Sequence, residues 1–248
     1  MRVIIMESKV FAIIQARMSS TRLPGKVLKE LSGRPILYHI IQRIKSVKSI
    51  DKIIIATSQK QSDDPIEQFA NAQGVACFRG NENDVLERFF NAAQTFGAGE
   101  GDLIIRLTAD NPFVDPGVCE ELLSYYRENS FSYVTTDGYP LGVGTEIFSF
   151  CALRDAYLNA QEPYEREHVT PFMYHPRQLF GKLKSAEDHS NIRLTVDTPE
   201  DCRVAEILYD SLYQEEKLFK LSEILEYLKN YPDVIAINKD IHQKQLGE

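Results

Sequence analysis

Cysteine and long apolar runs are both scarce in this sequence. Four cysteines occur in 248 residues, and they lie too far apart for a zinc site or a compact disulfide framework. We therefore expect reduced, mostly buried thiols. No stretch approaches the roughly 18 apolar residues of a membrane-spanning helix, and the N-terminus lacks the apolar core of a signal peptide. These absences predict a cytoplasmic protein that folds without metal or disulfide staples.

Positive charge is also scarce. With 28 Lys and Arg residues against 36 Asp and Glu residues, the formal net charge is −8. Nucleic acids and anionic membranes are bound through a diffuse positive field, so this balance predicts neither kind of partner. Residues 8–29 are a local exception, because they contain no acid and five bases: Lys9, Arg17, Arg22, Lys26 and Lys29. A small anionic ligand is the expected reason for this cluster.

The chain contains no Pro/Gly/Ser-rich linker, no internal repeat and no low-complexity tract. Its length and its 43% apolar content suit one sizeable α/β domain. We expect residues 1–248 to form a single domain with a core over about 10–210 and a helical C-terminal extension over 211–248. An amphipathic pattern at Leu221, Ile224, Leu225 and Leu228 indicates one helix in that extension.

Short apolar runs alternate with amphipathic segments through the first half of the chain. The runs predict strands at 10–16, 53–57, 75–78 and 103–107, and the amphipathic segments predict helices at 36–44, 65–73 and 84–96. In the second half we expect helices at 116–127, 152–160, 165–174 and from Thr198, and strands at 133–136, 146–150, 178–183 and 191–195. This order predicts an α/β fold in which a mainly parallel sheet is covered by helices on both faces.

A basic loop follows the first expected strand, at the carboxyl edge of the sheet, where open α/β folds bind ligands. Its sequence over 16–26 is ARMSSTRLPGK. The small residues allow backbone N–H groups to approach phosphate oxygens, while Arg17, Arg22 and Lys26 can neutralise several negative charges. A triphosphate fits these features, although no Walker-type motif is present. A solvated cationic surface turn is the structural alternative.

Four ordered motifs carry a family resemblance. They are IIQARMSSTRLPGKVL, TADNPFVDP, EREHVTP and RLTVDTPED. The first resembles the sugar cytidylyltransferases, which include the synthetases of CMP-Kdo and CMP-sialic acid, and together they look most like the spore coat polysaccharide biosynthesis protein F family. The resemblance spans about residues 10–210. It departs from the family pattern at Ser19, Ala109 and Asn111, where relatives often have Gly, Gly and Cys.

This resemblance implies a Rossmann-like nucleotidyltransferase fold of the GT-A kind, CTP as the nucleotide, Mg²⁺ as cofactor and a homodimer. It also implies nucleotide binding by five residues of the basic loop: Ala16, Arg17, Ser20, Arg22 and Lys26. Arg17, Arg22 and Lys26 would bind the triphosphate and act in catalysis, with Lys26 nearest the charge that develops on the leaving group.

Two acids follow expected strands, Asp110 after 103–107 and Asp197 after 192–196. In the resembling enzymes the acids at these motif positions hold magnesium against the triphosphate, so Asp110 and Asp197 are the expected metal ligands, with Asp110 also catalytic. Taken singly, Asp110 can instead start a turn and Asp197 can cap a helix.

The base and the acceptor have weaker candidates. Arg79, Asn83 and Asp84 follow the third expected strand, where relatives recognise the base; a helix starting at Asp84 is an equally good account. For the acceptor, Glu146, Arg166 and His168 are the candidates. Arg166 could clamp a carboxylate or phosphate, and His168 could act as general base. For the neighbouring Glu165 and Glu167, an exposed helix start is the favoured account.

The leading hypothesis is a Mg²⁺-dependent cytidylyltransferase that transfers CMP from CTP to a sugar or sugar-like acid and releases pyrophosphate, for surface polysaccharide. The alternative is a glycosyltransferase of related fold that uses a nucleotide sugar. Such enzymes usually carry a D-x-D metal motif, which this sequence lacks. A non-catalytic nucleotide-binding regulator is a third possibility, which the retention of Lys26, Asp110 and Asp197 disfavours.

Overall fold

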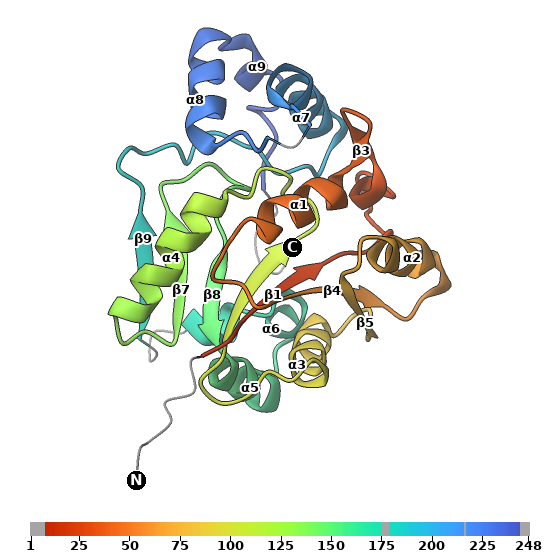
Figure 1. Ribbon diagram of the computed structural model, residues 1–248, viewed down its shortest axis with the longest axis vertical. Helices are drawn as coiled ribbons and strands as arrows, with labels where there is room; N and C mark the ends of the chain where they lie inside the picture. The colour runs from red at the N-terminus through yellow and green to blue at the C-terminus, as the bar shows by residue number, and fades with distance from the viewer. Residues whose placement is uncertain (1–7, 175–178, 216, 244–248) are drawn as a thin grey trace.

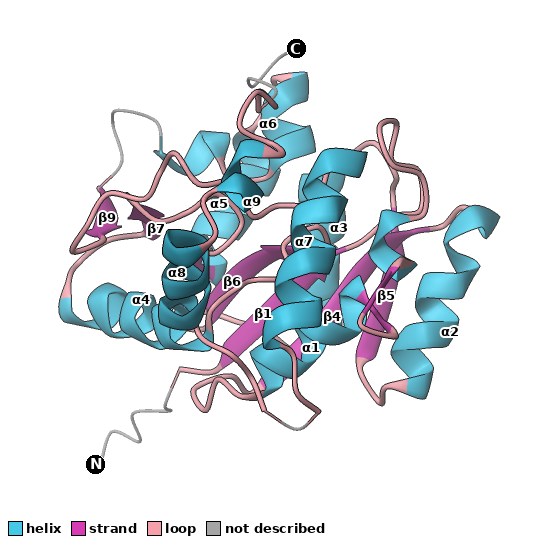
Figure 2. Ribbon diagram, turned by 90° about the horizontal axis from the view of Figure 1, so that it is seen from above, coloured by secondary structure: helices cyan, strands magenta, loops and turns pink. Residues whose placement is uncertain are grey.

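A seven-stranded mixed sheet with the strand order β5-β4-β1-β6-β8-β7-β9 forms the centre of the protein. The computed structural model describes residues 8–174, 179–215 and 217–243 (Figure 1). Four neighbouring strands are mutually parallel and lie side by side (Figure 2): β1 (Val10–Gln15), β4 (Lys52–Ser58), β5 (Ala76–Gly80) and β6 (Leu103–Thr108). Their carboxyl ends therefore share one edge of the sheet.

Strand β8 (Glu146–Ser149) reverses the direction of the sheet. It pairs antiparallel with β6 and with β7 (Tyr133–Asp137), and β9 (Phe180–Lys184) then pairs parallel with β7. Because of this reversal, the first residue of β8 lies where β6 ends, and Glu146 is the register partner of Arg106. The predicted mixed, mainly parallel sheet is confirmed.

Helices cover both faces of the sheet, as expected (Figure 1). One face carries α1 (Ile36–Lys45), α2 (Asp64–Ala72), α4 (Pro116–Glu128) and α7 (Pro199–Leu212), and the other carries α3 (Val85–Thr95) and α5 (Phe150–Asn159). In β1, Val10, Ala12 and Ile14 join the first apolar cluster, whereas Phe11 and Ile13 join the second. Alternate side chains of a strand point to opposite faces, so a strand buried on both sides is apolar throughout.

The C-terminal segment packs onto the core as α8 (Leu221–Asn230) and α9 (Asp233–Ala236). Phe219, Ile224 and Leu228 belong to the first apolar cluster, which also contains Val10, Ala12 and Ile14 of β1. Residue 210, where we expected the core to end, lies inside α7. All four cysteines are free, with two of them buried. Within the described ranges, no helix is long and apolar enough to cross a membrane.

Three sequence expectations need correction. Residues 191–195 do not form a sheet strand, since Arg193 makes only an isolated bridge with Leu141. The expected helix at 165–174 is two pieces, α6 (Pro163–His168) and a 3₁₀ turn (Pro171–Tyr174), separated by Val169 at φ 72°. Phe150 begins α5 and does not end β8. The strand expected at 178–183 is β9, and residue 178 lies outside the described residues.

Short elements that the sequence analysis did not anticipate surround the basic loop. They are two 3₁₀ turns (Lys26–Leu28 and Gln61–Asp63) and the hairpin of β2 (Glu30–Leu31) with β3 (Arg34–Pro35). The hairpin leads directly into α1, so the chain returns from the sheet edge to the covering layer within a few residues.

Candidate functional site

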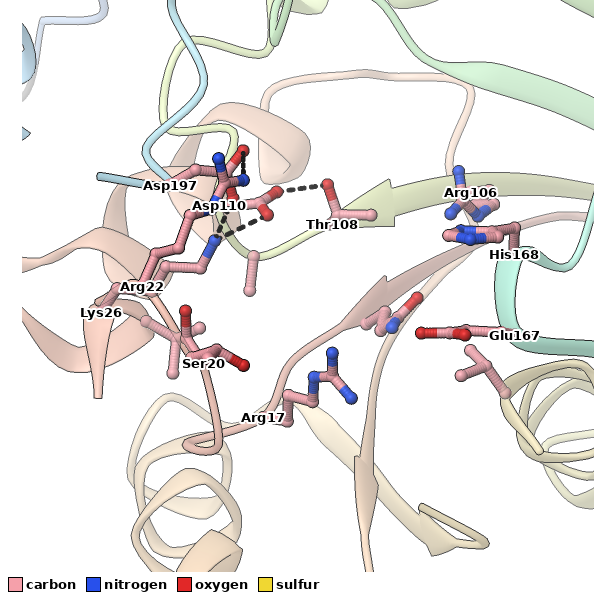
Figure 3. A pocket seen from close by; sticks show the side chains of 15 residues that line it. Arg17, Ser20, Arg22, Lys26, Arg106, Thr108, Asp110, Glu167, His168 and Asp197 are labelled. Carbon is pink, nitrogen blue, oxygen red and sulfur yellow. Dashed lines mark hydrogen bonds and ion pairs between the residues drawn. The ribbon is translucent and has the colours of Figure 1, made fainter. Parts of the chain in front are cut away.

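A cavity of about 240 Å³ opens at the shared carboxyl edge, where β1 and β6 end. Its walls come from the basic loop, from β6, from α6 and from two acids (Figure 3): Arg17, Ser20, Arg22, Lys26, Arg106, Thr108, Asp110, Glu167, His168 and Asp197. A second cavity of about 610 Å³ shares most of these residues and extends to Leu141, Tyr164 and Gln243. The segments predicted to meet at the sheet edge therefore do meet there.

The basic loop is held in shape from beneath. Asp63, which is buried, accepts a hydrogen bond from the Met18 amide at 2.8 Å, and the carbonyl of Met18 accepts one from the Gly25 amide at 2.9 Å. Gly25 adopts φ 70°, a conformation that glycine tolerates without a Cβ clash. The amides of Thr21 and Arg22 donate to no residue that the structure describes. The loop thus keeps backbone donors available for an anion.

Lys26 lies between the two predicted metal ligands. Its Nζ is 2.9 Å from Asp110 Oδ2 and 2.7 Å from Asp197 Oδ1, and the residue is only 8% exposed. Thr108 Oγ1 donates to Asp110 Oδ1 at 2.6 Å. Burial favours the neutral acid, but the Lys26 charge and the Thr108 hydrogen bond outweigh it and lower the pKa of Asp110. The carboxylate is ionised at neutral pH.

Asp197 is fixed by cations and by the start of α7. Arg22 and Arg193 approach its Oδ2 at 3.2 and 2.9 Å. We had expected Asp197 to follow a sheet strand, and this prediction is wrong. Instead, the amide of Val196 donates to the carbonyl of Asp110 at 2.8 Å, and this backbone bond brings the two acids together. The helix predicted from Thr198 is confirmed, and Thr198 is its cap, because its side chain accepts a hydrogen bond from the Asp201 amide.

The donor set of this pair suits magnesium. Across the described part of the chain, no group of three or more His, Cys, Asp or Glu side chains is arranged to hold a metal. Two ionic carboxylates nevertheless converge on a single cation, the Lys26 ammonium. Mg²⁺ prefers oxygen ligands and is commonly bound by one or two carboxylates, with water and substrate phosphates completing its shell. Asp110 and Asp197 therefore fit it.

The opposite end of the cavity holds Arg106 and His168, and Arg17 and Glu167 line the wall between the two ends (Figure 3). Arg17 makes no ion pair with any residue in the described ranges. Burial and the charges of Arg106 and Arg17 outweigh the opposing charge of Glu167 and lower the pKa of His168. The imidazole is therefore neutral at pH 7 and able to accept a proton.

A strained turn places His168. Val169 has φ 72° and ψ −54°, and the amide of Thr170 donates to the carbonyl of His168 at 2.8 Å. This is a γ-turn with positive φ, a conformation that costs a β-branched residue roughly 1–3 kcal/mol. It ends α6 and separates two functions: His168 lines the cavity, while the Thr170 hydroxyl donates to Glu146 at 2.8 Å.

Glu146 lies behind the cavity wall. Its Oε2 pairs with Arg106, and its Oε1 accepts hydrogen bonds from Tyr133 and Thr170. It is not among the described residues that line the two cavities. The structure thus places this acceptor candidate as a support for Arg106.

Arg166, Asp84 and Arg79 are engaged with protein groups. Asp84 caps α3 and pairs with Arg166 at 2.6 Å, and both line a third cavity that adjoins the first at Arg17. Arg79 pairs with Asp64 and Glu67 at 2.6 and 2.9 Å. It faces a separate surface hollow, so the structure does not bring it to the other site candidates. The helix start that we considered at Asp84 is present.

Several site residues escaped the sequence analysis: Gln15, Asp63, Arg106, Thr108, Arg193 and Asp201. Arg106 and Thr108 had a usable signal, because they are polar at alternate positions of an otherwise apolar strand. Ala16 is buried at the end of β1, and its amide donates to the carbonyl of Ala56 at 3.2 Å. Ser19 and Ala109 have negative φ, so glycine is not required at either position.

Comparisons with known proteins converge on one family. The family model described as Cytidylyltransferase matches residues 11–241. An uncharacterised protein of Methanocaldococcus jannaschii is 39% identical over 97% of this chain and 98% of its own length. The spore coat polysaccharide biosynthesis protein SpsF of Bacillus subtilis is 35% identical over 90% of this chain and 95% of its own. A solved cytidylyltransferase from Leptospira borgpetersenii superposes with a TM-score of 0.86 at 30% identity, covering 96% of this chain and all of that one.

Proposed function

This chain belongs to the cytidylyltransferase family, and from that premise we propose that it transfers CMP from CTP to a sugar or sugar-like acid, with Mg²⁺ as cofactor and pyrophosphate as the second product, in the synthesis of a surface polysaccharide. One observation carries the proposal. Asp110 and Asp197 converge on Lys26 at the end of a loop whose backbone donors are available. A triphosphate with a divalent cation is the ligand that this combination of charges suits.

In this reaction the acceptor oxygen attacks the α-phosphorus and pyrophosphate leaves. The loop amides, Arg22 and Lys26 bind the triphosphate and stabilise the negative charge that builds up on the leaving group. Asp110 and Asp197 would hold Mg²⁺, which supplies further charge neutralisation at the phosphates. Arg193 and Asp201 act indirectly, because they fix the orientation of Asp197.

His168 is the proposed general base. Its neutral imidazole lines the cavity, in which the acceptor hydroxyl must meet the α-phosphate. The third cavity, bordered by Arg17, Asn83 and Asp84, is the proposed place of the cytosine ring. The paired Arg79 has no part in this scheme, and Arg166 contributes by holding Asp84.

Pyrophosphate release tests the proposal. The four nucleoside triphosphates are each offered with Mg²⁺ and a panel of keto-acid sugars, sugar phosphates and small phosphorylated acids. We expect release from CTP only when both metal and an acceptor are present. Asp110→Asn and Asp197→Asn should lower the rate by at least about 100-fold with the fold retained by circular dichroism, whereas Asp188→Asn, an exposed control, should not. Sugar transfer from a nucleotide sugar without use of CTP would establish the glycosyltransferase alternative instead.

A further inference from the structure

We propose that Arg106 recognises an anionic group, a carboxylate or a phosphate, on the acceptor. This inference rests on the proposed function, because it presupposes that the acceptor enters the cavity that Arg106 lines. Arg106 would be a specificity-determining residue, and Glu146 would be the residue that positions it.

The first argument is the rigidity of Arg106. It lies directly opposite Glu146 in the antiparallel pair of β6 and β8, and NH1 of its guanidinium pairs with Glu146 Oε2. The other oxygen of Glu146 is occupied by two buried donors, Tyr133 and Thr170, each 3% exposed. A carboxylate held from three directions fixes the plane of the guanidinium, and a fixed planar fork is what bidentate binding of an anion needs.

The second argument is that Arg106 has donors left over. Its Nε is buried without a hydrogen-bond partner, and its NH2 group donates to no residue in the described ranges. A buried donor without a partner is unfavourable, so native structures rarely retain one unless a ligand or water completes it. Nε and NH2 together form one edge of the guanidinium. The accessible NH2 can donate to a carboxylate or a phosphate in the cavity, and an anion seated against this edge would also satisfy the buried Nε.

The third argument is location. In Figure 3, Arg106 and His168 lie across the cavity from Lys26, Asp110 and Asp197, which form the proposed triphosphate and metal end. Arg22 and Lys26 pair with the two acids of that end and would serve the triphosphate, so Arg106, beside the proposed general base, is available to another anion. Arg106 also lines the larger cavity, which extends toward Leu141 and Tyr164 and gives an acceptor room. An anion held there would be adjacent to His168.

The Nε–H resonance of Arg106 in nuclear magnetic resonance spectra gives a direct test. The protein is first saturated with Mg²⁺ and the α,β-methylene analogue of CTP, which cannot release pyrophosphate. It is then titrated with 3-deoxy-manno-octulosonate, a carboxylate probe, with mannose 1-phosphate, a phosphate probe, and with mannose as the neutral control. Arg106→Lys assigns the resonance. We expect a saturable shift with at least one anion and none with mannose, and the responding probe identifies the anion.

Binding measurements on variants complete the test. Arg106→Gln should weaken binding of the responding anion roughly 10- to 100-fold, the range for losing a charge-assisted contact. Glu146→Gln should weaken it less, and Arg106→Lys should restore part of the loss that Arg106→Gln causes. Arg154→Gln is the matched control, because Arg154 is a half-exposed residue outside the cavities and is paired with Glu100. The affinity for the nucleotide analogue should change by less than about twofold in all four variants.

Two results would overturn the proposal. One is the absence of any anion-dependent shift of the Arg106 resonance. The other is a shift produced by the nucleotide alone together with weakened nucleotide binding in Arg106→Gln, which would assign Arg106 to the triphosphate. Failure of the proposed function is recognised separately, because the wild-type protein would then not bind Mg²⁺ and the CTP analogue at all.

Discussion

Lys26 illustrates how one side chain links segments that are distant in the sequence. It follows the tight turn at Gly25 and contacts acids that come after β6 and before α7. A nearly buried ammonium is unfavourable unless it is paired, and two carboxylates close together are unfavourable unless a cation separates them. The ammonium and the two carboxylates therefore offset one another's cost of burial and repulsion. A phosphate or a metal ion would enter a site whose charged groups are already in place.

Replacing Lys26 by methionine removes this cation while keeping similar bulk. We expect Lys26→Met to weaken binding of Mg²⁺ with CTP and to slow pyrophosphate release by about 100-fold or more, because a phosphate ligand is lost. Isothermal titration and a release assay measure both effects. Lys29→Met is the matched control, since Lys29 is partly exposed and its contact with Glu206 is 3.8 Å. Equal behaviour of the two variants would contradict the assigned role of Lys26.

His39 controls stability at low pH. It is buried on α1 among the rings of Tyr209 and Tyr213, with Nε2 2.8 Å from the Leu31 carbonyl. Burial lowers its pKa from 6.5 to about 4. The unfolded chain therefore binds the proton more readily, so the contribution of His39 is complete above pH 6.5 and is lost as the pH falls toward 4.

Denaturant unfolding at several pH values measures this contribution. Between pH 6.5 and 4, the range between the two pKa values of His39, the free energy of unfolding should fall by up to about 1.4 kcal/mol per pH unit because of this residue. His39→Gln keeps a hydrogen-bonding group but has no charge change, so its curve should be flatter by that amount. Parallel curves for wild type and variant would exclude the assignment.

At the scale of elements, the start of α7 acts as a platform for Asp197. Asp201, only 1% exposed, accepts from Arg193 at 2.8 and 3.1 Å and from the amides of Asp197 and Thr198. The hydrogen bonds to Arg193 help to lower the pKa of Asp201 despite its burial. The acid that closes the capping box therefore also holds the backbone of the proposed metal ligand.

Asp201→Asn should disrupt this platform. The buried guanidinium of Arg193 then loses one of its two carboxylate partners, so we expect the free energy of unfolding to fall by about 2–4 kcal/mol. We also expect lower affinity for Mg²⁺, because Asp197 loses its anchor. Glu200→Gln, an exposed change in the same helical turn, should cost less than about 1 kcal/mol. Metal titration separates the two effects, and an unchanged metal affinity in Asp201→Asn would argue against the platform.

The elements differ in how well their sequences predicted them. β1 and the start of α7 were predictable, because an all-apolar strand and a Thr-Pro-acid start each reflect local preferences. Residues 191–195 resemble a strand by composition, yet Gly142 lies so close that an added Cβ would be 2.6 Å from the Thr195 amide nitrogen. This close approach of two segments of the chain is a tertiary contact, which the local sequence does not predict. The break at Val169 is also tertiary, because no local preference favours positive φ in valine.

Side-chain roles were harder to predict than positions. The loop and Asp110 meet as expected because each follows a strand of the sheet, whereas Asp197 joins them through the backbone bond between Val196 and Asp110. Glu146, in contrast, lies at the predicted edge of the sheet but contacts Arg106 and not the cavity. Its neighbour is determined by the pairing of β6 with β8, which the sequence does not reveal. Arg166 and Asp84 were singled out for different ligands and are partners of each other. Such pairings depend on how helices approach one another, which no sequence pattern here encodes.

At the scale of the whole molecule, the C-terminal segment is part of the fold. Phe219 is 2% exposed, and Arg43 lies over its ring at 4.3 Å and donates to its carbonyl at 3.0 Å. Asn238 reaches Asp201 at 2.9 Å, so the segment also supports the platform of Asp197. The extension therefore stabilises both the core and the site.

Phe219→Ala tests the contribution of this segment. Removing a buried aromatic ring should lower the free energy of unfolding by about 3–5 kcal/mol, and the thermal transition should remain single because the segment shares the core. Tyr231→Ala, which truncates an aromatic residue that is 56% exposed, is the matched control and should cost much less. A separate low-temperature transition in Phe219→Ala would show instead that the tail folds independently.

Sedimentation equilibrium on the wild type measures the homodimer that the family resemblance predicts.

The reversed strand β8 divides the sheet into two parts that present different sides of the cavity. The parallel strands β5, β4, β1 and β6 present the loop and Asp110, whereas β8 and the turn after α6 present Glu146, His168 and Thr170. Exchanging the segment from β8 through that turn between relatives should thus change the residues that position Arg106 and His168, while the loop and Asp110 keep their places. The direction of one strand therefore decides which segments of the chain furnish each wall of the cavity.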